Sequence, residues 1–222
     1  MEPEPNFWER PDVVADFAAR APDQRLQELL PQYDDPRSTR VLDIGCAGGR
    51  NTVLLAQQGF DVHAIDASAA MVAETRRRVA PLLGDAEARQ RIRVGRMDDL
   101  SDFADASIDL VVALGILHNA GSRAEWGRAA GEAARVLRPG GRLLVAHFSP
   151  ETDLTGEGVR PVPGEAHVYD GLPAGRATLL SAPELDAAMA RFGLAPSTPT
   201  TMGATKTERG RRVSVNALYR KG

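Results

Sequence analysis

The segment 41–51 reads V-L-D-I-G-C-A-G-G-R-N, and its residue types and spacing suit the binding of a ligand. A short β-branched run ends at Gly45, and a glycine-rich turn then leads into a helix. Glycines let a ligand approach the backbone closely, and the first turn of a helix offers free N–H groups to an anion. A second acid, Asp66, ends the next strand about 20 residues later, where a carboxylate can accept both ribose hydroxyls of an adenosine-type ligand. A nucleotide-like cofactor is therefore expected.

Asp43, two residues before Gly45, discriminates between cofactor classes. A pyrophosphate would be repelled by this carboxylate, whereas a ligand with a positive ammonium group would be attracted to it. The turn also reads Gly45-x-Ala47-x-Gly49 instead of the complete G-x-G-x-x-G of dinucleotide binding. Asp43 therefore favours S-adenosylmethionine, whose ammonium lies beside a carboxylate that the amides of the turn could hold.

The elements that must position these residues alternate between strand and helix. Strands are expected over 40–44, 61–65, 91–95, 108–114 and 142–148. Helices are expected over 51–58, after the capping residue Ser68, and around Trp126 as far as Pro139-Gly140-Gly141. Met71, Val72, Thr75 and Val79 share one face of the second helix. The alternation predicts an α/β fold, Rossmann-like and doubly wound, with helices on both faces of a mostly parallel seven-stranded sheet.

The last third of the chain follows a different pattern. Residues 149–180 are rich in Gly and Pro and show no period, which predicts a long loop or insertion. Ser181 and Glu184 form a capping box that begins a helix. Two strand-like runs, about 196–205 and 212–219, then predict an antiparallel hairpin. We expect one domain over 1–222, with an N-terminal helical lid (1–35), a cofactor-binding core (36–148), a substrate-side insertion (149–180) and a C-terminal helix and hairpin (181–222).

Four stretches in order, 41–51, 66–71, 108–112 and 135–141, resemble the class I S-adenosylmethionine-dependent methyltransferases of the small-molecule type (methyltransferase type 11/25-like). The resemblance covers roughly residues 40–148. It departs from the family pattern at Gly95-Arg96-Met97-Asp98-Asp99, where members usually carry an acid and a small residue after a glycine. It implies that S-adenosylmethionine is the cofactor and S-adenosylhomocysteine its product.

The resemblance also assigns roles to residues. It places the methionine portion of the cofactor at Gly45 to Gly49, the ribose at Asp66, the adenosine beside Met71 and the adenine near Met97 and Asp98. The expected cofactor-binding residues are Asp43, Gly45, Cys46, Ala47, Gly49, Asp66, Ala67, Met71, Met97, Asp98 and Leu114.

Methyl transfer from a sulfonium needs placement and exclusion of water more than it needs a base. Ligands of open α/β sheets bind at the carboxyl ends of the strands. His118, just after the strand 108–114, is therefore the first candidate for a catalytic residue, and His147 is the second. Residues expected to shape or close the acceptor pocket are Tyr169, Asp170, Phe7, Trp8 and Phe17.

Composition limits the remaining classes. The net charge of −3 argues against a nucleic-acid partner. The single cysteine, Cys46, excludes an intrachain disulfide and fits a reducing cytoplasm. The histidines have no metal-ligand spacing, so no metal is expected, and no apolar stretch is long enough to cross a membrane. Arginine far outnumbers lysine, which suggests a bacterial genome. The expected partner is a small-molecule methyl acceptor, and a homodimer stays open.

Several alternatives remain at this point. Gly48-Gly49-Arg50-Asn51 and Gly59-Phe60-Asp61-Val62 are similar to the thiol and tellurite methyltransferases, whose soft nucleophiles need no general base. A non-catalytic module that binds S-adenosylmethionine would share the same cofactor residues. A nicotinamide-dependent oxidoreductase is disfavoured by Asp43. A nucleic-acid methyltransferase is disfavoured by the acidic balance and by the lack of an Asn/Asp-Pro-Pro-aromatic motif.

Overall fold

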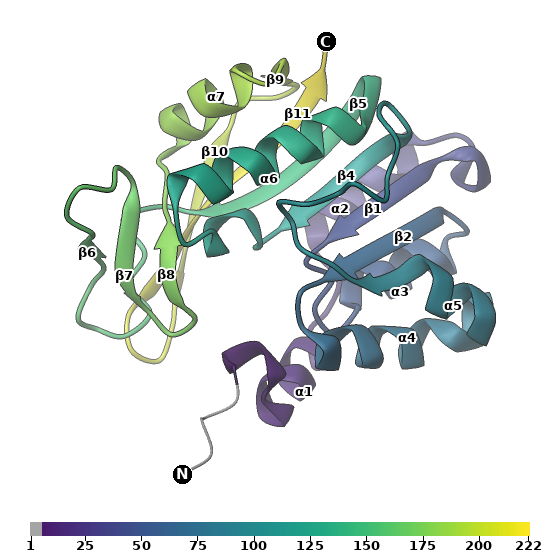
Figure 1. The fold of residues 1–222 in the computed structure, drawn as a ribbon, viewed down its shortest axis with the longest axis horizontal. Coiled ribbons are helices and arrows are strands. Elements are labelled where there is room, and N and C mark those ends of the chain that lie inside the picture. The colour runs from purple at the N-terminus through teal and green to yellow at the C-terminus, as the bar shows by residue number, and fades with distance from the viewer. Residues whose placement is uncertain (1–5) are drawn as a thin grey trace. The chain divides into compact units, whose positions relative to one another are not determined.

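The computed structural model of the chain describes residues 6–222 (Figure 1). Residues 1–5 of the expected N-terminal lid lie outside the described residues. The chain divides into two compact units, one of Met1–Arg96 with Ile108–Leu110 and the other of Met97–Ser107 with Val111–Gly222. This division does not follow the boundaries at 35, 148 and 180, which stay predictions. None of the described helices is both long and apolar enough to span a bilayer.

Parallel strands form the centre of the first unit. β1 (Arg40–Ile44) pairs with β2 (Asp61–Asp66), which pairs with β3 (Ile92–Val94). In β1 only Arg40 is exposed, as expected for a parallel strand that is covered on both faces. The strands end together at Ile44, which is opposite Ile65, so the turn after β1 lies beside the end of β2.

Helices α3 (Arg50–Gln57), α4 (Ala69–Leu83) and α5 (Asp85–Arg91) complete the α/β part of this unit. Ser68 caps α4 by accepting a hydrogen bond from the Met71 N–H. The buried residues of α4 are the four that were predicted to share one face: Met71, Val72, Thr75 and Val79. Helix α5 was not predicted, because its short polar sequence has no apolar period.

Short helices precede β1, as predicted for the first 35 residues. Proline at the first position favours the start of α1, since its missing N–H has no helical partner there. Asp23 caps α2 by accepting from the Arg25 N–H. The elements are η1 (Phe7–Glu9), α1 (Pro11–Ala19), α2 (Gln24–Leu29), η2 (Leu30–Gln32) and η3 (Pro36–Ser38).

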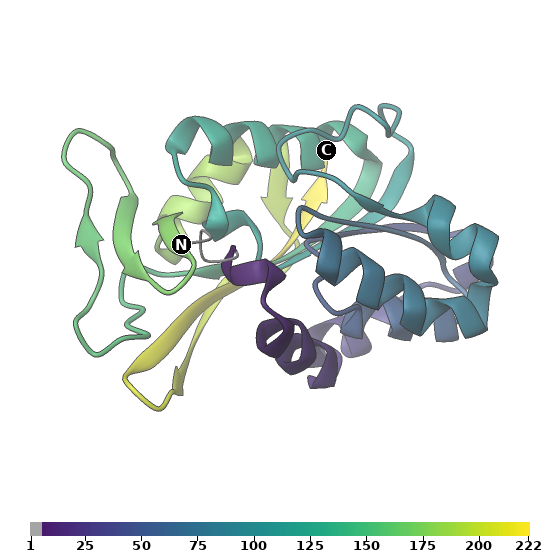
Figure 2. The same ribbon diagram turned by 60° about the horizontal axis from the view of Figure 1, so that its bottom comes forward.

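The second unit contains most of β4 (Ile108–Leu114), all of β5 (Leu137–Phe148) and the antiparallel strands that follow β5. The later strands of the main sheet are β9 (Leu194–Pro196), β10 (Thr201–Lys206) and β11 (Arg211–Lys221). β11 pairs antiparallel with β5, β9 and β10, so the predicted terminal hairpin is present (Figure 2). The helices are η4 (Leu117–Asn119), α6 (Arg123–Val136) and α7 (Ala182–Ala190), and α7 begins with the predicted capping box.

The order of the main sheet is β10-β11-β5-β4-β1-β2-β3, with β9 added beside β11. The seven strands of this path agree with the predicted mostly parallel sheet that ends in an antiparallel pair, and β9 was not foreseen. β5 also begins earlier than expected. The helix ends at Val136, and extended backbone starts at Leu137 because Pro139, which lacks an N–H, cannot continue the helical ladder.

The prediction that residues 149–180 form an aperiodic loop was wrong in part. They contain a three-stranded antiparallel sheet of β6 (Arg160–Pro161), β7 (Val168–Leu172) and β8 (Gly175–Thr178). The Leu179 N–H donates to the backbone carbonyl of His167. The Leu180 N–H donates to the backbone carbonyl of Phe148 at the end of β5. The strands are too short and too rich in glycine to give an alternating pattern, so tertiary pairing sets their conformation.

Ala47 has φ of 48°, in the left-handed region that costs a residue with a side chain about 1–2 kcal/mol. Ala47→Gly removes this strain and adds about 0.5–1 kcal/mol of backbone entropy to the unfolded chain. We expect a net rise of up to about 1 kcal/mol in the free energy of unfolding, measured by urea titration. The control Ala73→Gly, at an exposed position of α4, should lower it by about 1 kcal/mol. Equal losses in both variants would contradict the strain at Ala47.

Candidate cofactor and acceptor sites

The turn after β1 is held by hydrogen bonds to the end of β2. The N–H groups of Gly45 and Cys46 both donate to the Ile65 carbonyl, at 2.8 and 3.0 Å. The Ala47 N–H donates to Oδ2 of Asp66 at 2.9 Å. Because these donors point at β2, the turn has a fixed backbone before any ligand arrives.

This bonding corrects one part of the sequence interpretation. The amides of Gly45, Cys46 and Ala47 were expected to be available to a carboxylate, but they are engaged within the protein, and the Gly49 N–H donates to the Cys46 carbonyl. What the turn offers to a ligand is therefore a close approach to the backbone rather than a set of free donors there.

Two glycines of the turn are required by packing. A Cβ on Gly48 would lie 2.6 Å from the backbone of Ala18 in α1. Gly49 has φ of 80°, and a Cβ there would lie 2.9 Å from the side chain of Thr75 in α4. Thr75 also donates its hydroxyl to the Ala47 carbonyl at 2.6 Å. Gly48 and Gly49 thus let α1 and α4 contact the turn closely.

Asp43 is a buried carboxylate at the end of β1, only 2% exposed. Its Oδ2 accepts the Thr52 hydroxyl of α3 at 2.7 Å. Burial raises the pKa of Asp43 to about 6, and the bond from Thr52 opposes this rise. The Arg50 cation also opposes the rise, but burial dominates, and a cationic ligand group nearby would stabilise the ionised Asp43.

Asp66 joins three parts of the first unit. Its Oδ2 accepts the Ala47 N–H of the turn, and its Oδ1 accepts the Ser68 N–H before α4, both at 2.9 Å. Burial raises the pKa of Asp66, the two backbone bonds oppose the rise, and the nearby Glu9 carboxylate adds to it. Each oxygen of a carboxylate has two acceptor positions, so the local structural role leaves acceptor capacity for hydroxyl donors.

Glu9 is a residue of this site that sequence reasoning missed. Its two carboxylate oxygens accept the Ala69 and Ala70 N–H groups, at 2.8 and 3.1 Å, and so cap the start of α4. The Ser68 hydroxyl donates to the Trp8 carbonyl at 3.0 Å. Glu9 lies 60 residues from this helix in sequence, and no local pattern marks such a contact.

The remaining predicted residues of the first unit have varied surroundings. Cys46 is buried, its pKa is raised by burial, and its thiol contacts Thr75, so it is a packing residue and no nucleophile. Ala67 is exposed, whereas Met71 is buried in the core, and its contact with the adenosine stays a prediction. The Trp8 ring contacts Phe7 and Phe17 edge to face, with centroid distances of 4.9 Å to Phe7 and 5.5 Å to Phe17.

The second unit holds the other predicted cofactor residues, and their contacts with a cofactor also stay predictions. The Asp98 carboxylate pairs with Arg128 of α6 at 2.8 Å and is largely buried. Met97 is buried, and Leu114 is half-buried at the end of β4. In the insertion, Tyr169 is half-buried in β7, and Asp170 pairs with Arg176 at 3.3 Å.

His118 lies in η4, directly after β4, and is 3% exposed. Its ring stacks on Phe148 with centroids 3.8 Å apart and planes inclined by 12°. Within residues 6–222, Nδ1 of His118 is a buried nitrogen without a hydrogen-bond partner. Burial holds the pKa of His118 well below its usual range, and the neighbouring His147 and Arg212 lower it further. The imidazole is therefore neutral at pH 7.

His147, the second candidate, has hydrogen-bond partners at both ring nitrogens. Its Nε2 accepts the Trp126 indole N–H at 2.9 Å, and its Nδ1 lies 2.9 Å from the Phe148 carbonyl. A carbonyl only accepts, so Nδ1 carries the proton and the tautomer is fixed. Burial lowers the pKa of His147 to about 4. Because neither nitrogen is available, His147 is a structural residue and the prediction that it could act as a base was wrong.

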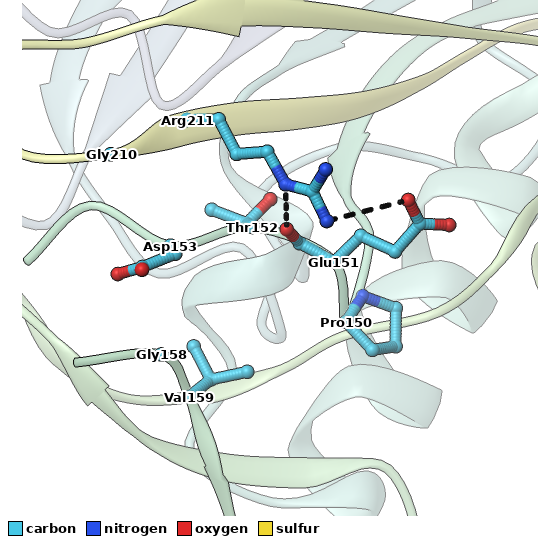
Figure 3. Close-up of a pocket in the computed structure, with 8 residues that line it drawn as sticks. All are labelled: Pro150, Glu151, Thr152, Asp153, Gly158, Val159, Gly210 and Arg211. Atoms are coloured by element: carbon cyan, nitrogen blue, oxygen red, sulfur yellow. Dashed lines mark hydrogen bonds and ion pairs between the residues drawn. The ribbon is translucent and has the colours of Figure 1, made fainter. Parts of the chain in front are cut away.

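A cavity of about 530 Å³ lies beside the loop that follows β5 (Figure 3). Its polar groups are already partnered within the protein. The Arg211 guanidinium donates to the Glu151 carbonyl at 3.1 Å, and the Asp153 carboxylate accepts the Gly156 N–H at 2.7 Å. Neither His118 nor the glycine turn lines it, so we do not place the chemistry there. Among the described residues no cluster of His, Cys, Asp or Glu could hold a metal ion.

Comparison with known proteins supports the resemblance seen in the sequence. Residues 42–145 match the family model of a methyltransferase domain. The chain is 41% identical over 110 residues to a demethylmenaquinone methyltransferase of Beutenbergia cavernae, covering 50% of this chain and 41% of that protein. It is 33% identical over 113 residues to a ubiquinone biosynthesis O-methyltransferase of Xanthomonas oryzae pv. oryzae, covering 50% and 44%. The chain thus spans less than half the length of these relatives.

Solved structures share the fold. An S-adenosylmethionine-dependent methyltransferase of Methanosarcina mazei matches 91% of this chain and 99% of its own, with a TM-score of 0.68 and 20% identity. A 1,6-didemethyltoxoflavin-N1-methyltransferase of Burkholderia thailandensis, solved with 1,6-didemethyltoxoflavin and S-adenosylhomocysteine, matches 96% and 80%, with a TM-score of 0.63 and 19% identity. Residues 42–145 thus match a methyltransferase domain, and the chain shares its fold with these S-adenosylmethionine-dependent enzymes.

Proposed function

We propose that this protein is a methyltransferase (EC 2.1.1.-) that uses S-adenosylmethionine to methylate a small-molecule acceptor. The observation that carries the proposal is the pair of carboxylates beside the glycine turn. Asp43 is buried with one hydroxyl partner, and Asp66 bridges the turn and the start of α4. The family match over residues 42–145 supports the same cofactor.

The two carboxylates of the first unit fit two polar groups of this cofactor, the ammonium and the ribose hydroxyls. Asp43 would attract the ammonium group, because a buried carboxylate gains most from a cation. Asp66 would accept the ribose hydroxyls with the acceptor positions that its two backbone bonds leave free. When bound, the cofactor supplies an activated sulfonium methyl group, and the protein orients the acceptor and excludes water from it.

His118 is the side chain that we assign to the acceptor. Its Nδ1 has no partner among the described residues, and its imidazole is neutral, so it can accept a hydrogen bond or a proton from an acceptor hydroxyl. A pKa well below 7 makes it a weak base, which suits an acceptor that is already acidic. We further propose a cytoplasmic enzyme without a nucleic-acid partner, in line with its single cysteine and its net charge of −3.

Two alternatives remain compatible with the site. A thiol or tellurite-type methyltransferase would use the same cofactor residues and would need no base, because its nucleophile is anionic. A module that binds the cofactor without catalysis would keep the carboxylates and use none of the residues near His118.

Cofactor binding is tested by thermal unfolding with S-adenosylmethionine, S-adenosylhomocysteine or NAD⁺. A ligand at 100 times its dissociation constant adds about 2.7 kcal/mol, which for this size raises the unfolding temperature by about 5–10 °C. We expect that rise with the first two ligands only. Asp66→Ala should abolish it, whereas Asp99→Ala, an exposed control, should retain it. A rise with NAD⁺ alone, or no rise at all, would contradict the proposal.

The raised pKa of Asp43 predicts a pH-dependent stability of the protein without ligand. The folded-state pKa of about 6 lies above the ordinary value, so the folded protein holds this proton more tightly than the unfolded chain. The stabilisation is present at low pH and is lost as pH rises towards 6. Relative to Asp43→Asn, we expect the wild-type free energy of unfolding to fall by about 2 kcal/mol between pH 4 and 7.

Binding of S-adenosylhomocysteine should show the opposite trend, because the ionised form of Asp43 is the one that attracts the ammonium. We expect wild-type affinity to rise about tenfold from pH 5 to 7. Asp43→Asn should bind more weakly, with little pH dependence. Calorimetric titration measures both variants, and equal affinities at pH 7 would show that Asp43 does not contact the ammonium.

Replacement of His118 separates base-assisted transfer from transfer to soft nucleophiles. A general base contributes about 10²- to 10⁴-fold, so His118→Asn should lower the methylation of a phenol or enol by that factor. Turnover of thiols, selenite or tellurite should not change. Release of S-adenosylhomocysteine with a panel of both kinds of acceptor measures this. Rapid turnover of soft nucleophiles alone would establish the thiol-type alternative, and no turnover despite cofactor binding would favour the non-catalytic one.

A further inference from the structure

The pairing of β5 with β11 separates two faces of the sheet in the second unit. Phe148 lies opposite Ser214, and residues that are directly opposite in an antiparallel pair share a face. Side chains alternate along a strand, so Arg212 and Asn216 lie on the same face as Phe148. His147 lies on the other face, together with Val215.

The two faces differ in composition and burial. The face with His147 is apolar and buried, and Trp126 of α6 covers His147. The Phe148 face is polar and half-buried or exposed. β10 extends it, because Gly203 lies opposite Ser214 and Thr205 opposite Arg212. We call this the Phe148 face, made of Phe148, Thr201, Gly203, Thr205, Arg212, Ser214 and Asn216.

His118 extends this face at the end of β4. Its ring stacks on Phe148 and meets the His147 ring edge to face at a centroid distance of 5.7 Å, and its Nδ1 has no partner among the described residues. A buried polar atom without a partner destabilises the protein, and a ligand that bonds to it removes that cost. His147, whose side chain lies on the opposite face, donates its Nδ1–H to the carbonyl of Phe148 and so fixes the backbone there.

The charged side chains that shift the pKa of His118 and His147 are cations. The charged side chain that acts on His118 is Arg212, and the one that acts on His147 is Arg123. No carboxylate is among the groups that shift the pKa of either ring. The strands of the Phe148 face also carry no acid, since β10 and the stretch 211–217 contain neither Asp nor Glu. An ammonium group would find no counter-ion there, whereas an anion would find Arg212.

We propose that the Phe148 face is the acceptor site and that it selects an acceptor with an acidic oxygen group, such as a phenol, an enol or a carboxylic acid. Arg212 binds the oxygen of that group in its anionic form, His118 Nδ1 accepts the proton of a group that arrives protonated, and the rings of Phe148 and His118 pack against a planar portion. Amines are poor acceptors at this site. This inference rests on the proposed function, because it identifies the acceptor of that reaction.

The test uses histidine-labelled protein and nuclear magnetic resonance, with benzoate, benzamide and benzylammonium as probes of one shape and three charges. His118→Asn assigns the His118 ring signals. We expect benzoate to shift these signals and to leave those of His63 in place. Benzamide should bind at least about tenfold more weakly, and benzylammonium should not shift His118.

Arg212→Gln should weaken benzoate at least about tenfold and leave benzamide unchanged. Arg209→Gln, in the turn between β10 and β11, removes the same charge and should bind benzoate like wild type. The unfolding temperatures of both variants verify that they are folded. Equal weakening in both variants, a stronger response to benzylammonium, or no response of His118 to benzoate would overturn the inference. If the wild-type protein does not bind S-adenosylhomocysteine, the proposed function is refuted. The benzoate titration tests the acceptor site separately from that result.

Discussion

The cofactor-binding part of the molecule depends on the two hydrogen bonds that the Asp66 carboxylate accepts. One oxygen holds the Ala47 N–H of the glycine turn, and the other holds the Ser68 N–H before α4. Each charged hydrogen bond of this kind contributes about 1.5–3 kcal/mol. The position of Asp66 at the end of β2 follows from the parallel register with β1, so the sheet itself brings the carboxylate to the turn. Glu9 adds a second set of bonds to α4 beside it.

The same geometry explains why the turn tolerates an unfavourable backbone and a buried acid. Ala47 has a left-handed conformation, yet its N–H and C=O are both bonded, to Asp66 and to Thr75. Asp43 is kept out of water with one hydroxyl partner. Local strain and a poorly compensated charge persist where the surrounding structure fixes them and a ligand relieves them. In the second unit, the unpartnered Nδ1 of His118 is a comparable feature.

Sequence patterns predicted the parts of the structure that local periodicity determines. The buried face of α4, the capping residues Ser68 and Ser181, and the strands that carry Asp43 and Asp66 have the predicted positions. Contacts between distant segments could not be predicted. The bonds from Glu9 to α4 span 60 residues, and the bond that occupies His147 comes from Trp126 on another element. The prediction of free amides in the turn was wrong, because the N–H groups of Gly45, Cys46 and Ala47 donate to acceptors on the next strand.

The most direct test of the account is an amide-resolved titration of the ¹⁵N-labelled protein with S-adenosylhomocysteine. It reports each backbone N–H separately, so it locates the ligand as well as detecting it. The account predicts that the signals of Gly45 to Gly49 and of Asp66 to Ala70 shift with one common dissociation constant, while those of the β10–β11 turn at Glu208 and Arg209 do not. Saturable binding that leaves the turn and the start of α4 unchanged would contradict the assignment of the cofactor to the carboxylates Asp43 and Asp66.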